Sequence, residues 1–103
     1  MKETMEEVVR AHILVRGKVQ GVGFRAFTQY QATFRKLQGW VRNCAGGEVE
    51  LEIEGPNRSV DAFLQAMRQG PPLSQVLQVT VDWKEPNRQT EGFKIIRSSL
   101  EKG

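Results

Sequence analysis

Residues 8–25 read V-V-R-A-H-I-L-V-R-G-K-V-Q-G-V-G-F-R and pass from a strand pattern to a helix pattern through three glycines. Apolar side chains at every second position from Val9 to Val15 have the period of a half-buried β-strand. The glycines allow backbone N–H groups to converge on one point, and the N-terminus of the following helix adds the positive end of its dipole. Arg25 adds a planar, permanently charged fork of donors that suits a phosphate group. We therefore expect a strand, an anion-binding loop and a helix in that order.

Two helices are indicated by the spacing of apolar residues. Between Phe24 and Leu37 the spacing predicts about three helical turns, with Phe34 on the face that packs against a sheet. A later set falls at positions i, i+3, i+4 and i+7, which is one helix face: Val60, Phe63, Leu64 and Met67. This set predicts a second helix, which the sequence G-P-P at residues 70–72 ends.

The remaining segments have the alternating pattern of strands. Residues 39–44 and 48–54 alternate around a glycine-rich connection, which predicts an antiparallel hairpin. Residues 76–83 alternate again, and residues 93–98 predict a short closing strand. The resulting order is strand, helix, strand, strand, helix, strand and a short extra C-terminal strand. We therefore expect an α+β fold, the ferredoxin-like α/β sandwich (βαββαβ), with two helices on one face of an antiparallel sheet.

Length and composition indicate one small domain. The 103 residues, 39% of them hydrophobic, can build one modest core. We place this domain at residues 8–98, between a loose N-terminal tail at 1–7 and a C-terminal tail at 99–103. No apolar run approaches the ~20 residues of a membrane span, and the first seven residues carry acids where a signal peptide has basic and then apolar residues. We expect a cytoplasmic protein with no membrane partner.

Several reactive or charged residues have structural explanations. Cys44 is the only cysteine, so an internal disulfide and a cysteine-based metal cluster are excluded, and we expect this residue to pack. His12 lies in the middle of the first strand, away from the loop, and we expect a structural role for it as well. Lys18 and Arg42 flank the predicted site, where they either steer anionic substrates or are ordinary strand-edge charges. The net charge of +3 is spread along the chain and does not identify a partner.

Two motifs carry a resemblance to a known family. G-K-V-Q-G-V-G-F-R at residues 17–25, followed by G-W-V-R-N at 39–43, resembles the two sequence signatures of the acylphosphatase family. Three further matches lie along the chain: G-G-E-V-E at 46–50, G-P-P at 70–72 and G-F-K-I at 92–95. The resemblance runs from about Val8 to Arg97 and implies a small, stand-alone acylphosphatase.

The resemblance implies a reaction and a set of site residues. The reaction is hydrolysis of the carboxyl-phosphate bond of a small acyl phosphate to a carboxylate and inorganic phosphate, without a metal, a cofactor or a covalent intermediate. Arg25 binds the phosphoryl group and Asn43 aims the attacking water. The implied phosphate-binding segment comprises Gly17, Lys18, Val19, Gln20, Gly21, Val22, Gly23, Phe24 and Arg25. These residue types fit the chemistry, because phosphoryl transfer needs mainly positioning and fixed positive potential.

Other functions remain open at this stage. A non-catalytic phosphate-binding or anion-binding regulatory module of the same fold would keep the loop and lack turnover. An RNA-binding domain of the same topology is disfavoured, because it needs exposed aromatic residues on its central strands, whereas the glycine-rich segment lies between a strand and a helix. We therefore expect no nucleic-acid partner, and we expect a monomer.

Lys36 departs from the family pattern. It stands where the family commonly has a glycine, between the first helix and the second strand. If the chain turns there through left-handed backbone space, a non-glycine residue costs on the order of 1 kcal/mol of stability.

Overall fold

The computed structural model describes residues 7–98, which form two helices and five strands. In chain order the elements are β1 (Val8–Lys18), α1 (Phe24–Phe34), β2 (Gln38–Asn43), β3 (Val49–Pro56), α2 (Asn57–Gln69), β4 (Gln75–Lys84) and β5 (Phe93–Ile95). This order confirms the predicted βαββαβ arrangement with a short final strand. Except for Glu7, the predicted tails at residues 1–7 and 99–103 lie outside the described residues. Neither of these helices has the length and apolar character needed to cross a membrane.

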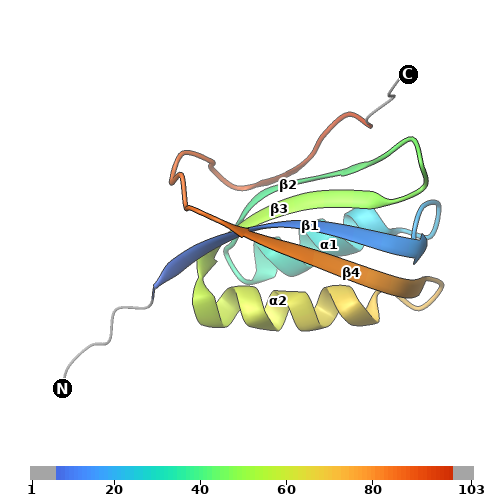
Figure 1. Ribbon diagram of the computed structural model, residues 1–103, viewed down its shortest axis with the longest axis horizontal. Coiled ribbons are helices and arrows are strands. Elements are labelled where there is room, and N and C mark those ends of the chain that lie inside the picture. The colour runs from blue at the N-terminus through green and yellow to red at the C-terminus, as the bar shows by residue number, and fades with distance from the viewer. Residues whose placement is uncertain (1–6, 99–103) are drawn as a thin grey trace.

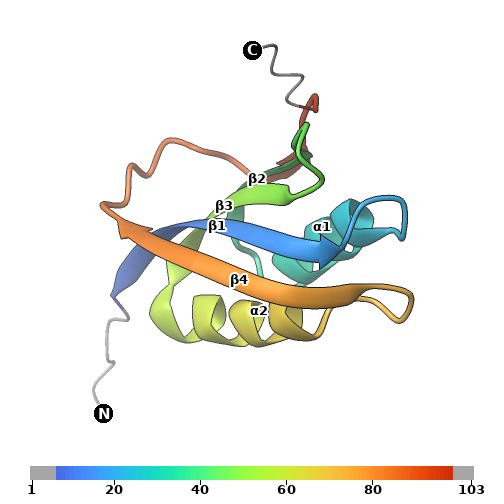
Figure 2. The same cartoon turned by 45° about the vertical axis from the view of Figure 1, so that its right-hand side comes forward.

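The strands form one sheet in the order β4-β1-β3-β2-β5, and both helices lie on one of its faces (Figure 1). The four long strands pair antiparallel, as predicted. The sheet is nevertheless mixed, because β5 pairs parallel to β2. The parallel pairing follows from the position at which β4 ends. Its last residue, Lys84, pairs with Arg10 of β1. The residue of β3 that pairs with Arg10 also pairs with Gln38, the first residue of β2, so β4 ends level with the start of β2. The connection from β4 crosses to the other edge at this end of the sheet (Figure 2), so β5 begins beside the beginning of β2.

The core lies between the helices and the inner face of the sheet. Alternate residues of β1, namely Ala11, Ile13 and Val15, are fully buried, as their period predicts. The apolar face predicted for the second helix is buried in α2. The β1 side chains that alternate with the buried ones, among them Arg10 and His12, lie on the outer face of the sheet, opposite the helices.

The first helix presents a different face to the core from the one predicted. Its buried residues are Phe24, Thr28 and Ala32, at intervals of four. Phe34 lies two positions beyond Ala32, about 200° around the helix axis, and therefore points outward. It is 68% exposed and stacks on Tyr30, so its placement on the buried face was wrong.

The end of α1 confirms the expected left-handed turn at Lys36, whose φ is 58°. The N–H of Leu37 donates to the carbonyl oxygen of Ala32 at 2.9 Å, and the N–H of Lys36 donates to that of Thr33 at 3.0 Å. These two bonds form a Schellman motif, in which glycine is the usual left-handed residue. The buried side chain of Leu37 accompanies the motif and anchors the start of β2 to the core.

Ion pairs join the strands across the outer face of the sheet. Arg10 on β1 pairs with Glu52 and with Glu54 of β3, the latter at 2.8 Å. Glu50 accepts from Arg42 at 2.8 Å and contacts His12 Nε2 at 2.7 Å. His12 is therefore engaged on the face opposite the helices, in line with the structural role expected for it.

Candidate active site

The loop between β1 and α1 leaves the N-terminus of the helix open. Gly21 and Gly23 have φ values of 76° and 81°, in the left-handed region that glycine tolerates best. Gly23 is the residue that precedes the helix, and no side chain caps it. The first turn of α1 also contains no acidic residue. Its first N–H groups have no acceptor within the helix, so this end of α1 is suited to an anion.

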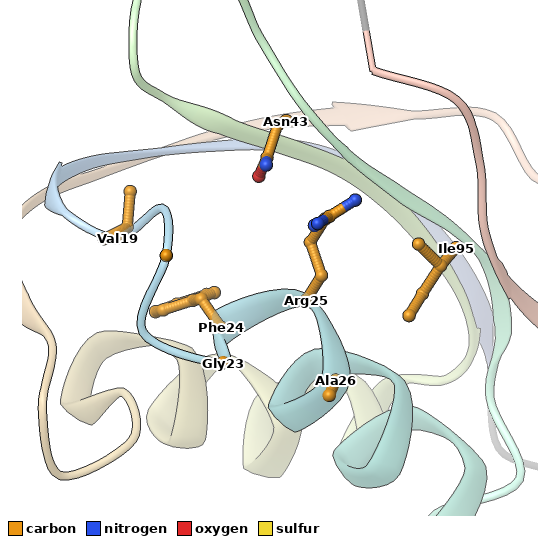
Figure 3. A pocket seen from close by; sticks show the side chains of 8 residues that line it. Val19, Gly23, Phe24, Arg25, Ala26, Asn43 and Ile95 are labelled. Carbon is orange, nitrogen blue, oxygen red and sulfur yellow. The ribbon is translucent and has the colours of Figure 1, made fainter.

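Arg25 projects from the first turn of α1 into the space beside this loop (Figure 3). The residue is half-buried, and no carboxylate of residues 7–98 forms an ion pair with it. A cation at a helix N-terminus is electrostatically disfavoured, because it faces the positive end of the dipole. A bound anion between the guanidinium and the helix end would remove this repulsion.

Asn43 reaches the same space from the last position of β2 (Figure 3). Strand alternation places it on the helix side of the sheet, two residues beyond the fully buried Val41. Its Oδ1 atom is buried and has no hydrogen-bond partner. Buried polar atoms in native proteins are rarely left unpaired, so this oxygen has an open position for a donor such as water.

These groups surround a cavity of about 240 Å³. Its lining residues are Val19, Gly21, Gly23, Phe24, Arg25, Ala26, Asn43 and Ile95. The volume accommodates a small ligand rather than a macromolecular surface. The two residues predicted to be catalytic, Arg25 and Asn43, thus meet at one cavity although one lies on α1 and the other on β2.

The structure divides the predicted phosphate-binding segment into several environments. Five of its residues line the cavity: Val19, Gly21, Gly23, Phe24 and Arg25. Gly17 and Lys18 belong to β1, and both are exposed. Gly17 has a packing role, since a Cβ built there would lie 2.1 Å from the carbonyl oxygen of Gln75 on β4. Val22 is partly buried and packs against the hydrophobic core.

Gln20 joins the loop to the hairpin that carries Asn43. Its side-chain amide donates to the carbonyl oxygens of Cys44 and Glu48, each at 2.8 Å. These two residues stand on either side of the turn between β2 and β3. Gln20 therefore fixes the distance between the loop and the end of β2, a role that the sequence pattern did not indicate.

Ile95 and Ala26 line the cavity and were not predicted as site residues. Ile95 lies in the G-F-K-I match, which indicated only a strand. Alternation places Ile95 on the same face of the sheet as the buried Phe93, yet Ile95 is 40% exposed, and this combination identifies it as a lining residue. The alternation can be read from the sequence, but the exposed fraction can be read only from the structure.

The surroundings of Cys44, a thiol close to the site, favour its neutral form. Cys44 Sγ lies 3.7 Å from Glu50 Oε1. Burial, together with the negative charges of Glu50 and Glu48, raises the pKa of the Cys44 thiol. Since the thiolate is the reactive form, this environment does not favour nucleophilic catalysis. Cys44 is also absent from the cavity lining.

Comparisons with known proteins agree on one family. The family model described as acylphosphatase matches residues 11–95. An acylphosphatase of Moorella thermoacetica is 50% identical over 93 residues, covering 90% of this chain and 98% of the relative. One from Thermococcus kodakarensis is 47% identical over 88 residues, which cover 85% and 96% of the two chains. The crystal structure of acylphosphatase from Bacillus subtilis superposes with a TM-score of 0.83 at 40% identity, covering 85% of this chain and 98% of that one.

Proposed function

Because the chain belongs to the acylphosphatase family, and so hydrolyses the carboxyl-phosphate bond of acyl phosphates, we propose that Arg25, Asn43 and the loop of residues 19–23 form its active site. The observation that carries this proposal is the unpaired Oδ1 of Asn43, which opens onto the same cavity as Arg25 and the uncapped end of α1. The non-catalytic binding module is set aside, because relatives similar over most of their length are acylphosphatases.

The phosphoryl group of the substrate binds between the loop and Arg25. Backbone N–H groups from Gln20 to Phe24 donate to two of its oxygens, and the helix dipole adds positive potential. The guanidinium of Arg25 donates to the remaining oxygen and follows the charge that spreads over the phosphoryl group during the reaction. These groups would promote phosphoryl transfer by positioning the phosphoryl group and by stabilising its negative charge.

Asn43 holds the attacking water. Its Oδ1 accepts a hydrogen bond from the water and turns the water oxygen toward phosphorus, on the side opposite the leaving group. The new phosphorus–oxygen bond forms as the bond to the acyl oxygen breaks, and the carboxylate leaves with the electron pair. A carboxylate is a good leaving group and needs no general acid, while the proton of the water passes to a phosphate oxygen.

The substrate is a small acyl phosphate, and no metal takes part in the proposed reaction. Gln20 and the β2–β3 turn hold the two halves of the site together. We also propose that the enzyme works as a monomer in the cytoplasm, and the presence of a single cysteine in the chain is compatible with a reducing compartment. Size-exclusion chromatography tests the oligomeric state.

Two variants separate phosphate binding from water positioning. We expect Asn43→Ala to lower kcat by at least ~10²-fold, while its inhibition constant for inorganic phosphate stays near that of the parent enzyme. We expect Arg25→Ala to lose turnover and phosphate inhibition together. Steady-state hydrolysis of benzoyl phosphate, with inorganic phosphate as inhibitor, measures both quantities. Parent-like kcat in folded Asn43→Ala would remove this residue from the mechanism.

A further inference from the structure

The two sides of the cavity are formed by different elements and present different groups to a ligand. Val19 and Ile95 lie on opposite sides of it in Figure 3, with Arg25 between them. The polar groups proposed to bind phosphate belong to the loop, the first turn of α1 and Asn43. Ile95 of β5 and the small Ala26 of α1 also line the cavity and add hydrocarbon surface with no polar side-chain group.

Ile95 is exposed at a position that would normally be buried. It follows Phe93 by two residues on β5 and pairs with Val41 of β2, so it faces the helix side of the sheet. Phe93 is 7% exposed and Val41 is fully buried, whereas Ile95 is 40% exposed. Ile95 has the larger exposed fraction because its side chain faces the cavity instead of packing under a helix.

The position of Ile95 is fixed by its neighbours. The N–H of Ile96 donates to the carbonyl oxygen of Val41 at 2.9 Å. On the other side, the side-chain amide of Gln29 on α1 donates to the carbonyl oxygen of Phe93 at 3.1 Å. Because both flanks of Ile95 are tied, its side chain presents a defined apolar surface to whatever occupies the cavity.

The charge of the lining limits the kind of ligand that fits this side. Among the described residues that line the cavity, Arg25 is the only one with a charged side chain. The phosphoryl group takes up that charge in the proposed mechanism. A second carboxylate or phosphate on the acyl group would lose its hydration where it contacts Ile95. Because no cationic side chain of the lining would pair with it there, its binding would be unfavourable.

We infer that Ile95 and Ala26 form the surface that receives the acyl group and that this enzyme prefers acyl phosphates whose acyl group is apolar and uncharged. The inference rests on the proposed function, because it takes the phosphoryl position as the fixed point from which the acyl group extends. Ile95 acts as a specificity-determining residue: it contacts the acyl part of the substrate and takes no part in bond breaking.

The experiment compares kcat/KM for benzoyl phosphate and for succinyl phosphate, which carries a second carboxylate. We expect the parent enzyme to favour benzoyl phosphate by at least about 10-fold. Ile95→Ala should lower kcat/KM for benzoyl phosphate by about 5-fold and change that for succinyl phosphate by less than about 2-fold. Leu77→Ala is the matched control, because Leu77 is an exposed apolar residue of β4 that does not line the cavity.

Ile95→Lys gives the opposite test. Its ammonium group can pair with the second carboxylate, so the preference for benzoyl over succinyl phosphate should fall by at least about 10-fold. Inhibition by inorganic phosphate, expected to stay near the parent value, shows that each variant retains a folded phosphate site. Unchanged preference in both Ile95 variants with intact phosphate inhibition would overturn the inference. Hydrolysis that survives Arg25→Ala would instead overturn the proposed function, so the two failures are distinguishable.

Discussion

The polar groups of Arg25 and Asn43 stand in positions that are unfavourable for the stability of the protein without a ligand. The guanidinium of Arg25 stands at the positive end of α1, which costs about 0.3–1 kcal/mol. The buried Oδ1 of Asn43 lacks a donor, and an unsatisfied polar atom of this kind costs about 1–3 kcal/mol. A phosphoryl group and a water molecule would satisfy both, so the local cost is understandable as preparation for a ligand.

Lys36 is a third unfavourable residue, but it does not line this cavity. Its φ of 58° is unfavourable for any residue with a Cβ, and this conformation is the one that ends α1. We expect Lys36→Gly to raise the free energy of unfolding by about 1 kcal/mol, with hydrolytic activity unchanged. Urea denaturation measures the effect. Lys36→Ala is the control, because it removes the charge and keeps the Cβ; an equal gain in that variant would contradict the backbone explanation.

At the scale of elements, the site depends on the distance between one loop and one hairpin. Gln20 sets that distance through two hydrogen bonds from a single amide group. It reaches the hairpin from the loop, and the turn that it holds follows Asn43 directly along the chain. Gln20 is therefore a positioning residue, which acts on the reaction through the placement of the loop amides and of Asn43.

We expect Gln20→Ala to lower kcat/KM for benzoyl phosphate by about 10-fold and to weaken inhibition by phosphate as well. Both losses follow because a loosened loop presents its N–H groups less well. The combined loss distinguishes this variant from Asn43→Ala, in which phosphate binding persists. Gln65→Ala on the exposed side of α2 is the matched control. Parent-like phosphate inhibition in Gln20→Ala would show that the two hydrogen bonds do not position the loop.

The sequence was sufficient to predict the order of elements and the two motifs, since both depend on local periodicity and spacing. It could not show the orientation of α1, where Thr28 rather than Phe34 contributes to the buried face. The parallel pairing of β5 depends on where the chain crosses the sheet end, and Gln20 depends on a contact between the loop and the distant β2–β3 turn. These features are products of tertiary packing, which no single segment specifies.

At the scale of the whole molecule, the outer face of the sheet depends on ionised carboxylates. Burial raises the pKa of Glu54, but hydrogen bonds from Arg10 and from the N–H groups of Asn87 and Arg88 outweigh it and hold that pKa below its usual value. Glu54 thereby fastens the β4–β5 connection to the sheet. Glu50 has a lowered pKa for the same kind of reason: burial opposes ionisation, and bonds with His12 and Arg42 more than offset burial.

These lowered pKa values set the direction of the pH dependence. The carboxyls ionise more readily in the folded protein, so their stabilising contribution is complete above the unfolded-state pKa of about 4.3 and is lost as the pH falls through the folded-state values. We expect the free energy of unfolding to fall by about 1–3 kcal/mol between about pH 5 and about pH 3.

Urea denaturation as a function of pH measures this dependence. Glu54→Gln should be less stable than the parent at neutral pH, because it removes one of the two carboxylates that pair with the buried Arg10, and it should show a shallower acid decline. Glu91→Gln, a substitution of an exposed acid in the β4–β5 connection, serves as the control and should retain the parent profile. An acid decline as steep in Glu54→Gln as in the parent would remove Glu54 from this explanation.

The most direct test of the active site is the loss of benzoyl phosphate at neutral pH in the presence of EDTA, compared between the parent enzyme and Arg25→Ala. The proposed mechanism predicts full parent activity in the chelator and at least a ~10²-fold lower rate in the folded variant, because a preorganised donor to the phosphoryl group is missing. Parent-like hydrolysis by Arg25→Ala, or loss of parent activity on adding chelator, would contradict it.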